Sequence, residues 1–399
     1  MSVPLRICVV SAFPPGRSGV GDYGASLVDG FARDARVAHV TVFADQVADA
    51  PSVERAGRVE IRRVWRRDRA DIGLQLLRAI SATPSDIVWF NLGLSMFGTR
   101  PLAAASGIAS TLGAKVLGRR AVVTIHELPA LADLDALGFA PRQARAAGDA
   151  MLRVVRCADD IVVTLERYRA HLAERIPGAS LVHIPHGLWA RAEPLPEPAD
   201  ETVLVFGTFG PHKDPGIVAE AVARLRETRP GLRLLIAGAD HPRYPGFMAR
   251  CSERHRLGPS WLGYVPRDEL GALFARARVV VVPSLASSGS SGVVHRAVGY
   301  GRPVLVSDLP DFRAQAAEDD LAFAWFAAGD TGDLARSLAL LLDDRARRAQ
   351  LAAHNLRALA GRSPARIADA YLALFLARSA VRAGEVAVPR VRLEHGVEA

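Results

Sequence analysis

Short apolar runs alternate with stretches of helical pattern along most of this 399-residue chain. In the first half the apolar runs occupy residues 5–11, 39–44, 59–65, 86–92, 120–127, 159–165 and 180–187, and the first helix is expected over 23–33. A buried strand, a loop and an amphipathic helix form the repeating unit of a doubly wound sheet. We therefore predict one parallel-sheet domain over residues 1–188.

A second series of the same kind follows a segment rich in proline, alanine and acidic residues, which predicts a linker over 189–201. Apolar runs lie at 202–210, 232–239, 260–265, 278–284 and 303–308, with helices expected over 215–228, 245–255, 267–277 and 292–300. We predict a second domain over 202–363, a helix over 364–381 that packs back on the domains, and a flexible tail over 382–399. The fold class is α/β, with two Rossmann-like doubly wound parallel sheets facing a central cleft at the carboxyl ends of their strands, where such folds bind ligands.

The composition is that of a globular protein, with 50% hydrophobic and 23% charged residues. The chain contains no run of about eighteen apolar residues and starts without a leader pattern, so we expect a cytoplasmic protein. Its three cysteines are far apart and odd in number, which disfavours a disulfide framework and a zinc site.

The net charge of +8 indicates anionic partners. Aromatic residues make up only 6% and no basic segment is interleaved with them, which disfavours nucleic-acid binding.

Lysine is rare, because only Lys115 and Lys213 among the 50 basic residues are not arginine. Lys213 follows a predicted strand in "VLVFGTFGPHKDP". Lysine binds phosphate as a compact point charge, whereas arginine imposes a planar fork. This predicts a phosphate contact at Lys213, and the alternative is an exposed lysine without a role.

A loop of small residues, "LASSGSSG", follows the strand at 278–284 and precedes a helix. Glycine lets the backbone approach an anion closely, and a helix start adds a partial positive charge. Together with Lys213, the loop predicts a diphosphate site that includes Ser290, Ser291 and Gly292; alone, it is more typical of a simple connection.

These residues resemble the retaining nucleotide-sugar glycosyltransferases of the GT-B fold, a family 4-like group also called glycosyl transferases group 1. The similarity is carried by "FPPGRSGVGDYGASLVDGF", "VVTIHE", "HIPHGL", "FGTFGPHKDP", "WLGYVPRDELGALFARARVVVVPS" and "AVGYGRPVLVSDLPDF". It implies transfer of a hexosyl group from a nucleoside diphosphate sugar, such as a UDP or GDP sugar, with retention and without metal or other cofactor. It also implies contacts to the base around Tyr264 and Val265.

The chain departs from the family pattern at three positions. Ser288 and Arg296 stand where the family has two glutamates that contact the donor sugar and the ribose, and Thr208 replaces the arginine before the phosphate lysine. We place Arg296 in the first turns of its helix, where a cation opposes the helix dipole unless an anion is near. We expect Arg296 to contact the diphosphate or a charged donor sugar, and the alternative is a solvent-exposed arginine.

His126 ends a central strand of the first domain, and the resemblance implies that it lies near the transferred sugar, as a catalytic residue together with Lys213. A histidine at a strand end is otherwise typical of a satisfied structural residue. The resemblance further assigns Gly19, Val20, Gly21 and Asp22 to a loop that contacts the acceptor or the diphosphate.

Two other functions fit parts of the sequence. The missing glutamates favour a non-catalytic relative that binds a nucleotide or glycan as a partner subunit. Gly19-Val20-Gly21-Asp22-Tyr23-Gly24, with Asp45 further on, also satisfies the fingerprint of an NAD-dependent oxidoreductase, although "AFPPGR" separates it from the strand.

The acceptor is not identified by the sequence: a small molecule, a glycan or a lipid-linked acceptor all fit. Arg142, Arg145, Arg153 and Arg156 lie on one face of a predicted helix, with Arg119 and Arg120 nearby in sequence. This pattern is typical of a solvated face, and the alternative is peripheral contact with the inner membrane face or a lipid-phosphate acceptor. We predict no metal site, and interpret Asp133-Leu134-Asp135 as a chance match to a metal-binding motif.

Overall fold

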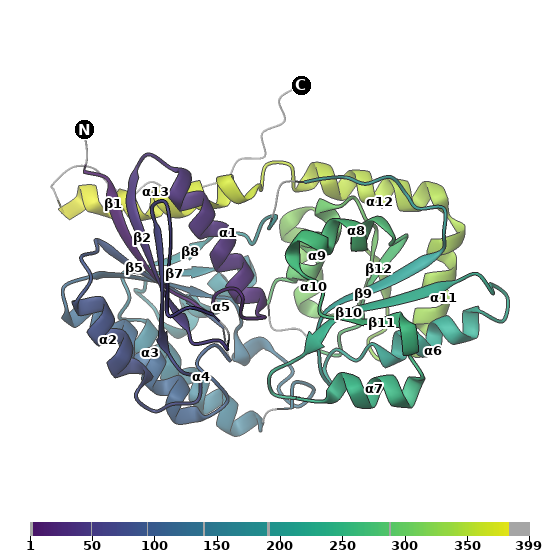
Figure 1. The fold of residues 1–399 in the computed structure, drawn as a ribbon, viewed down its shortest axis with the longest axis horizontal. Helices are drawn as coiled ribbons and strands as arrows, with labels where there is room; N and C mark the ends of the chain where they lie inside the picture. Colours follow the sequence, from purple (N-terminus) through teal and green to yellow (C-terminus); the bar gives the residue numbers. More distant parts are fainter. Residues whose placement is uncertain are drawn as a thin grey trace. The chain divides into compact units, whose positions relative to one another are not determined.

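The computed structural model describes residues 3–48, 50–93, 95–138, 140–189, 192–286 and 289–382, and the chain divides into two compact units (Figure 1). The first unit comprises Met1–Ala130, Arg142–Trp189 and Gly361–Ala399, and the second comprises Leu131–Pro141 and Ala190–Ala360. The predicted tail, apart from residue 382, lies outside the described residues.

The first unit is built on an eight-stranded sheet in the order β3-β4-β2-β1-β5-β6-β7-β8. Its strands are β1 (Leu5–Val10), β2 (Val37–Asp45), β3 (Val53–Ala56), β4 (Val59–Trp65), β5 (Ile87–Leu92), β6 (Arg120–Ile125), β7 (Asp160–Val163) and β8 (Leu181–His183). Its helices are α1 (Gly19–Arg33), α2 (Ile72–Ser81), α3 (Pro101–Val116), the 3-10 helix η1 (Pro129–Leu131), α4 (Pro141–Val155), α5 (Glu166–Arg175) and α13 (Pro364–Arg382).

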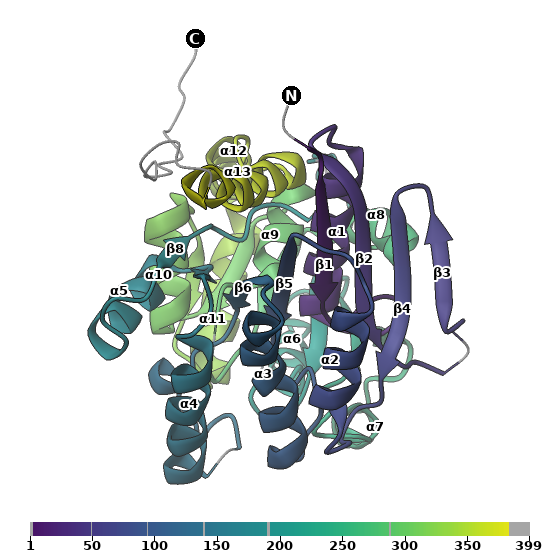
Figure 2. The ribbon, with the colours of Figure 1, turned by 90° about the vertical axis from the view of Figure 1, so that its left-hand side faces the viewer.

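All neighbouring strands of this sheet are parallel except the edge pair β3 and β4, which is antiparallel (Figure 2). The sequence analysis did not predict β3. Its four residues, "VERA", are exposed or half-buried and carry no apolar run, so no hydrophobic signal marks the strand. The central strands β1, β5 and β6 are buried over nearly their whole length, as expected for a sheet covered on both faces.

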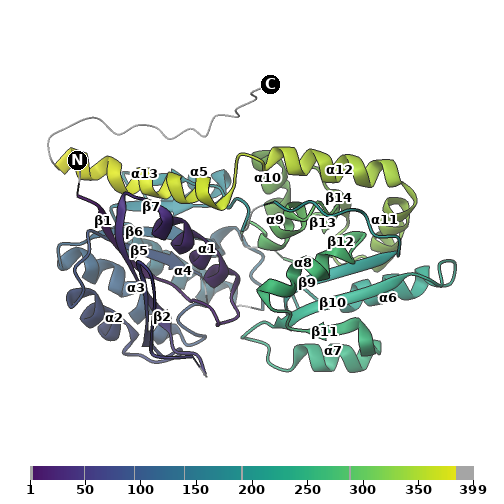
Figure 3. The same cartoon turned by 45° about the horizontal axis from the view of Figure 1, so that its top comes forward.

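Helix α13 packs beside α1 on one face of the first sheet (Figure 3). Tyr371 and Phe375 of α13 are fully buried together with Phe31 of α1 and Trp89 of β5. The Arg120 guanidinium donates to the carbonyl oxygens of Leu374 and Phe375 and to the Asp160 carboxylate, so it fastens α13 to the sheet. A segment more than 170 residues beyond the preceding part of this unit therefore completes its core.

The second unit has a six-stranded, fully parallel sheet in the order β11-β10-β9-β12-β13-β14. Its strands are β9 (Thr202–Phe209), β10 (Arg233–Asp240), β11 (Trp261–Gly263), β12 (Val279–Val282), β13 (Val304–Ser307) and β14 (Ala324–Phe326). Its helices are α6 (Gly216–Leu225), α7 (Phe247–His255), η2 (Gly258–Ser260), η3 (Arg267–Glu269), α8 (Leu270–Ala275), α9 (Gly292–Gly299), α10 (Pro310–Asp319), α11 (Thr331–Asp343) and α12 (Arg345–Ala358).

Both sheets have a point where the strand order reverses. In the first unit it lies between β1 and β5, and in the second between β9 and β12. At such a point the loops that leave two neighbouring strands run in opposite directions, which opens a crevice at the carboxyl ends. Each unit therefore has one place where its topology favours a ligand site.

Candidate functional site

Lys213 lies at the reversal point of the second sheet. It follows β9 in a tight turn, where its N–H donates to the carbonyl oxygen of Gly210 at 2.9 Å. The same turn pairs with the loop after β12, through a bridge between Lys213 and Ser284 and a bond from the Leu285 N–H to the His212 carbonyl oxygen at 2.7 Å. The two loops that leave β9 and β12 are thus joined at Lys213, as the sequence predicted from their positions after strands.

The ammonium group of Lys213 folds back onto β9. Its Nζ donates to the carbonyl oxygen of Phe206 at 3.2 Å. Burial lowers the pKa of Lys213 from 10.5 to about 8, because an ammonium in a desolvated place is costly to charge. An anionic ligand beside the ammonium would offset that cost.

Gly207 makes room for this ammonium. A Cβ at Gly207 would lie 2.7 Å from the Lys213 Nζ and 3.3 Å from Val293 Cγ2, and its φ of +134° is one that side chains rarely adopt. Gly207 is therefore the spacer that lets the ammonium lie beside the start of α9, since Val293 is the second residue of that helix.

The loop before α9 contributes polar groups to the same place. Ser291 is the N-cap of α9 and Gly292 its first residue. The Ser290 Oγ is buried and has no hydrogen-bond partner within the described part of the chain. The Ser291 N–H donates to the Gln315 side chain at 3.1 Å, so this amide supports the loop in the structure, whereas the sequence analysis placed it on a diphosphate. Ser288 lies outside the described residues.

The prediction for the position of Arg296 within its helix was wrong. Helix α9 begins at Gly292 and has only eight residues, so Arg296 lies in its last turn. There a cation is favoured by the helix dipole and needs no compensating anion. Its guanidinium carbon lies 5.9 Å from the centre of the Phe206 ring, within the range of a cation–π contact. Phe206 thus contacts both cations, Lys213 through its carbonyl and Arg296 through its ring.

The other predicted donor contacts lie along the same sheet. Thr208 is in β9, two residues after Phe206 and on the same face, and pairs with Ala239 of β10. Tyr264 and Val265 follow the edge strand β11, after Gly263 with φ +70°. Tyr264 is 46% exposed, so its ring is accessible beside the main chain that was predicted to contact the base.

His126 follows β6 in the first unit and is held by Asn91 at the end of β5. The Asn91 Nδ2 donates to Ser11 Oγ and to the Val20 carbonyl oxygen, both at 2.9 Å. The Asn91 Oδ1 must therefore accept, and it lies 2.6 Å from the His126 Nε2, which fixes the proton on that nitrogen. Burial lowers the pKa of His126 to about 4. The ring is neutral at pH 7, and its Nδ1 carries the lone pair that can accept a hydrogen bond.

An aromatic cluster surrounds His126. The Tyr23 ring lies edge-on to His126 at 4.9 Å and also contacts His186 at 4.6 Å. The Trp189 Nε1 donates to the His186 Nδ1 at 2.8 Å, and the two rings stack. These aromatic rings thus pack against one another near the reversal point of the first sheet.

Gly19, Val20, Gly21 and Asp22 belong to a helix, not to the predicted loop. The Ser18 side chain caps α1 by accepting the Gly21 N–H at 3.4 Å, so the helix starts at Gly19 and not at Tyr23. The two glycines hid this start, because glycine weakens the helical signal. Gly21 instead allows close packing, since a Cβ there would lie 3.0 Å from the Ala12 carbonyl oxygen.

Asp45, the expected ribose contact of an NAD enzyme, is buried at the end of β2 and accepts the Phe13 N–H at 3.3 Å. Its burial raises the pKa of the carboxyl group. The side chain thus holds the loop that follows β1, which is a structural role.

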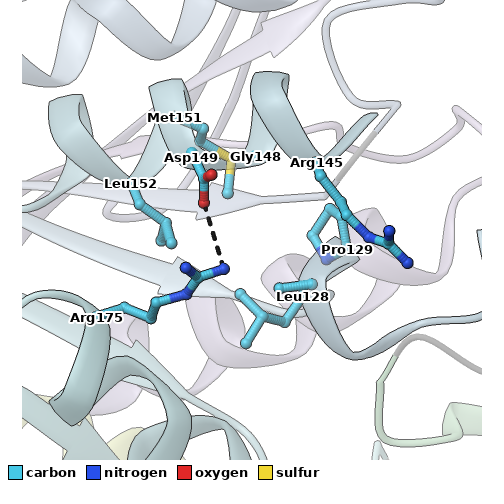
Figure 4. A pocket seen from close by; sticks show the side chains of 9 residues that line it. Leu128, Pro129, Arg145, Gly148, Asp149, Met151, Leu152 and Arg175 are labelled. Carbon is cyan, nitrogen blue, oxygen red and sulfur yellow. Dashed lines mark ion pairs between the residues drawn. The ribbon is translucent and has the colours of Figure 1, made fainter. Parts of the chain in front are cut away.

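A small pocket lies a few residues beyond His126 (Figure 4). Leu128 and Leu152 form part of its apolar wall, and Arg145, Asp149 and Arg175 supply charge. The Arg175 and Asp149 side chains form a half-exposed ion pair at 3.6 Å. Asp149 balances part of the charge through its pair with Arg175, and the Arg145 guanidinium extends away from that pair (Figure 4). The sequence analysis did not predict this pocket.

The basic face predicted near α4 is smaller than expected. Arg142, Arg145 and Arg153 are exposed along α4 and Arg156 is exposed just after it. Arg120 is buried against α13 and cannot contribute. No helix in the described residues is long and apolar enough to cross a membrane. Within the same residues, no cluster of three or more His, Cys, Asp or Glu side chains could hold a metal ion.

Comparisons with known proteins match part of this sequence to a family. Residues 200–344, most of the second unit, match the family described as Glycosyl transferases group 1. A curated relative, D-inositol 3-phosphate glycosyltransferase of Nocardia farcinica, is 32% identical over 208 residues. That match covers 49% of this chain and 45% of the relative, so it spans less than half the length of the relative.

Solved structures show the same fold over nearly the whole chain. Sucrose-phosphate synthase from Thermosynechococcus elongatus has a TM-score of 0.72 and 18% identity, covering 95% of this chain and 100% of that one. HepE of Anabaena, in complex with UDP and glucose, has a TM-score of 0.66 and 16% identity, covering 93% and 99%. The chain therefore has the α/β fold of GT-B glycosyltransferases, and its residues 200–344 match the glycosyl transferases group 1 family.

Several residues of the site were missed by sequence reasoning. Asn91 orients His126, while Gln315 and Asp311 of α10 bind the loop before α9. Asn91 ends an apolar strand, "DIVWFNL", and a polar residue there was a usable signal. Gln315 and Asp311 sit in a short helix of mixed character, where nothing in the sequence distinguishes a buried polar residue from an exposed one.

Proposed function

We propose that this protein is a glycosyltransferase that moves a hexosyl group from a nucleoside diphosphate sugar to an acceptor, with retention and without metal. The observation that carries the proposal is the ammonium of Lys213, packed beside Gly207 at the reversal point of a sheet whose sequence matches the group 1 family. Lys213 would neutralise the departing diphosphate, which is the main charge that develops during transfer.

The other groups have supporting roles in this proposal. The Ser290 Oγ and the amides at the start of α9 would bind diphosphate oxygens, and Arg296 would add a second cation through its place on Phe206. His126, neutral and oriented by Asn91, would accept a hydrogen bond from a sugar hydroxyl. A cationic role for His126 would require a ring that is already protonated, and its lowered pKa disfavours that.

The first acceptors to test are phosphorylated sugars and polyols. Two of the similar proteins, D-inositol 3-phosphate glycosyltransferase and sucrose-phosphate synthase, carry a sugar or polyol phosphate in their names. Arg145 and Arg175 line the small pocket together with Asp149, so its lining has a net positive charge that favours an anionic group. Comparing inositol 3-phosphate with inositol measures the contribution of the phosphate.

The decisive experiment measures binding and turnover separately. Isothermal titration with UDP, GDP, ADP and dTDP is expected to show one preferred nucleotide. Incubation with the corresponding nucleoside diphosphate sugars is then expected to release that nucleotide slowly. Substituting Lys213→Met should weaken binding of that nucleotide by about 100-fold, the usual effect of removing one member of a desolvated charge pair.

The outcomes separate the candidate functions. If the protein binds a nucleotide sugar but neither hydrolyses it nor transfers the sugar to an acceptor, the alternative function, a non-catalytic partner subunit, is favoured. Affinity that does not change in Lys213→Met would overturn the site. Anomeric NMR of the product decides between retention and inversion.

A further inference from the structure

We propose that Gln315, Asp311 and Asp319 of helix α10, together with His295 of α9, form a positioning network that sets the geometry of the loop before α9 for diphosphate binding. The inference rests on the proposed function, because it concerns how the same site is held. None of the four residues is a candidate for direct ligand contact. They are buried, at 4% exposure or less.

The network begins with the spacing of three residues on α10. Asp311, Gln315 and Asp319 follow one another at intervals of four, so they lie along one face of the helix. That face is turned inward, whereas Arg313 of the same helix is half-exposed and pairs with Asp308. A line of three buried polar side chains is costly unless each of them is bonded.

Two of these side chains bond the backbone of the loop. The Asp311 Oδ2 accepts the Gly289 N–H at 3.0 Å, and the Gln315 Oε1 accepts the Ser291 N–H at 3.1 Å. The amides of alternate loop residues are thus turned toward α10. Ser290 lies between them, and its Oγ is one of the buried side-chain atoms that have no hydrogen-bond partner in the described residues. Holding both neighbours fixes the backbone of Ser290 and therefore the place of its hydroxyl.

The third side chain anchors α9 itself. His295 is fully buried, and its Nε2 lies 3.2 Å from the Asp319 Oδ2, which as a carboxylate oxygen can only accept. Its Nδ1 lies 3.1 Å from the Ser291 carbonyl oxygen and 3.3 Å from the Gln315 Nε2. His295 therefore joins α9 to both the loop and α10.

Anchoring His295 also sets the rotation of α9. Arg296 is the next residue, about 100° around the helix, and this rotation brings its guanidinium over Phe206, whose carbonyl binds the Lys213 ammonium. Val293, on the same helix, flanks Gly207. The network on one side of α9 thus determines the positions of Arg296 and Val293 on the same helix, beside Phe206 and Gly207.

The test compares two buried amide side chains in the same unit. Gln315→Met removes the loop contacts with little change of volume. Asn355→Leu is the matched control, because Asn355 is equally buried in α12 and bonds the Ala322 backbone at 2.7 and 2.9 Å, away from the loop. Affinity for the nucleoside diphosphate that the wild type binds best is measured by titration, and stability by thermal unfolding.

We expect both variants to lower the melting temperature by similar amounts. Gln315→Met should also weaken nucleotide binding at least tenfold, whereas Asn355→Leu should leave the affinity within twofold of the wild type. A purely structural role of Gln315 would give equal affinities for the two variants.

The result is separable from the fate of the proposed function. If the wild type binds no nucleoside diphosphate, the glycosyltransferase proposal fails first. If the wild type binds, Lys213→Met weakens binding and Gln315→Met does not, only the positioning network is refuted. If Gln315→Met does not fold, two changes at Asp311 decide instead. Asp311→Asn keeps an oxygen acceptor for the Gly289 N–H, whereas Asp311→Ala removes it. Unchanged affinity in Asp311→Asn with a tenfold loss in Asp311→Ala supports the network, and equal affinities of the two variants refute it.

Discussion

The two sheets of this protein reverse their strand order in the same way but fill the reversal point differently. In the first unit the space is occupied by Tyr23, His126 and His186, which contact one another, and Asn91 bonds three neighbours. In the second unit it holds a lysine ammonium, a glycine without a side chain and a serine hydroxyl without a partner in the described residues. The two reversal points thus differ: the first is packed with side chains that contact one another, and the second has polar groups with few partners in the described residues.

The difference indicates where stability has been given up. A buried neutral histidine with a fixed hydrogen bond costs little, whereas a half-buried lysine ammonium that donates to one carbonyl oxygen among the described residues costs more. Sites that bind charge are commonly less stable than the scaffold around them. The reversal point of the second sheet is therefore the better candidate for ligand binding.

The largest effect is expected from filling the space at Gly207. In Gly207→Ala the new Cβ collides with the Lys213 Nζ and strains a φ of +134°, so nucleotide affinity should fall more than about 100-fold. Titration measures the loss. Gly231→Ala is the control, because a Cβ at Gly231 meets no atom within 4 Å. Equal binding by the two variants would contradict the spacer role of Gly207.

Removing the lysine charge should stabilise the second unit. The pKa of Lys213 is lowered from 10.5 to about 8, so the folded state holds fewer protons than the unfolded state between these values. The cost of charging is complete below pH 8 and disappears as the pH rises to 10.5. Lys213→Met should then gain up to about 3 kcal/mol at pH 7. Hydrogen exchange of the β9 and β12 amides measures it, and a loss of protection would contradict the idea.

The corresponding change in the first unit should have the opposite sign. His126→Ala leaves the Asn91 Oδ1 buried without its donor, which should cost about 1–3 kcal/mol. Because the folded pKa of His126 is about 4 and the unfolded value 6.5, its contribution is complete above pH 6.5 and is lost as the pH falls toward 4. Hydrogen exchange of β5 and β6 at pH 7 and 5 tests both statements. A stabilised His126→Ala variant would remove the contrast between the units.

The smallest effect is expected at Arg296. Its contact with Phe206 is at the outer limit of a cation–π interaction, worth about 0.5–1 kcal/mol at an exposed site. Arg296→Ala should therefore weaken nucleotide binding by about two- to fivefold, and Arg296→Lys by less. Unchanged affinity in Arg296→Ala would remove the proposed role and leave Lys213 as the cation that matters.

Apolar periodicity predicted the α/β fold well, because most residues of each central strand are apolar. It failed where hydrophobic signal is absent: β3 is polar, and glycines conceal the first turn of α1. Lys213 could be found because it is rare and follows a strand. Gln315 and His295 could not, since their importance comes from burial between two helices, which no local pattern reports.

Helix α13 has a consequence for synthesis. The ribosome produces the first 189 residues early, yet the hydrophobic surface of α1 and β5 that Tyr371 and Phe375 cover stays open until the last part of the chain emerges. The apolar surface that α13 covers therefore stays exposed while the second unit is translated. Production of residues 1–189 alone would leave that surface exposed permanently and favour aggregation.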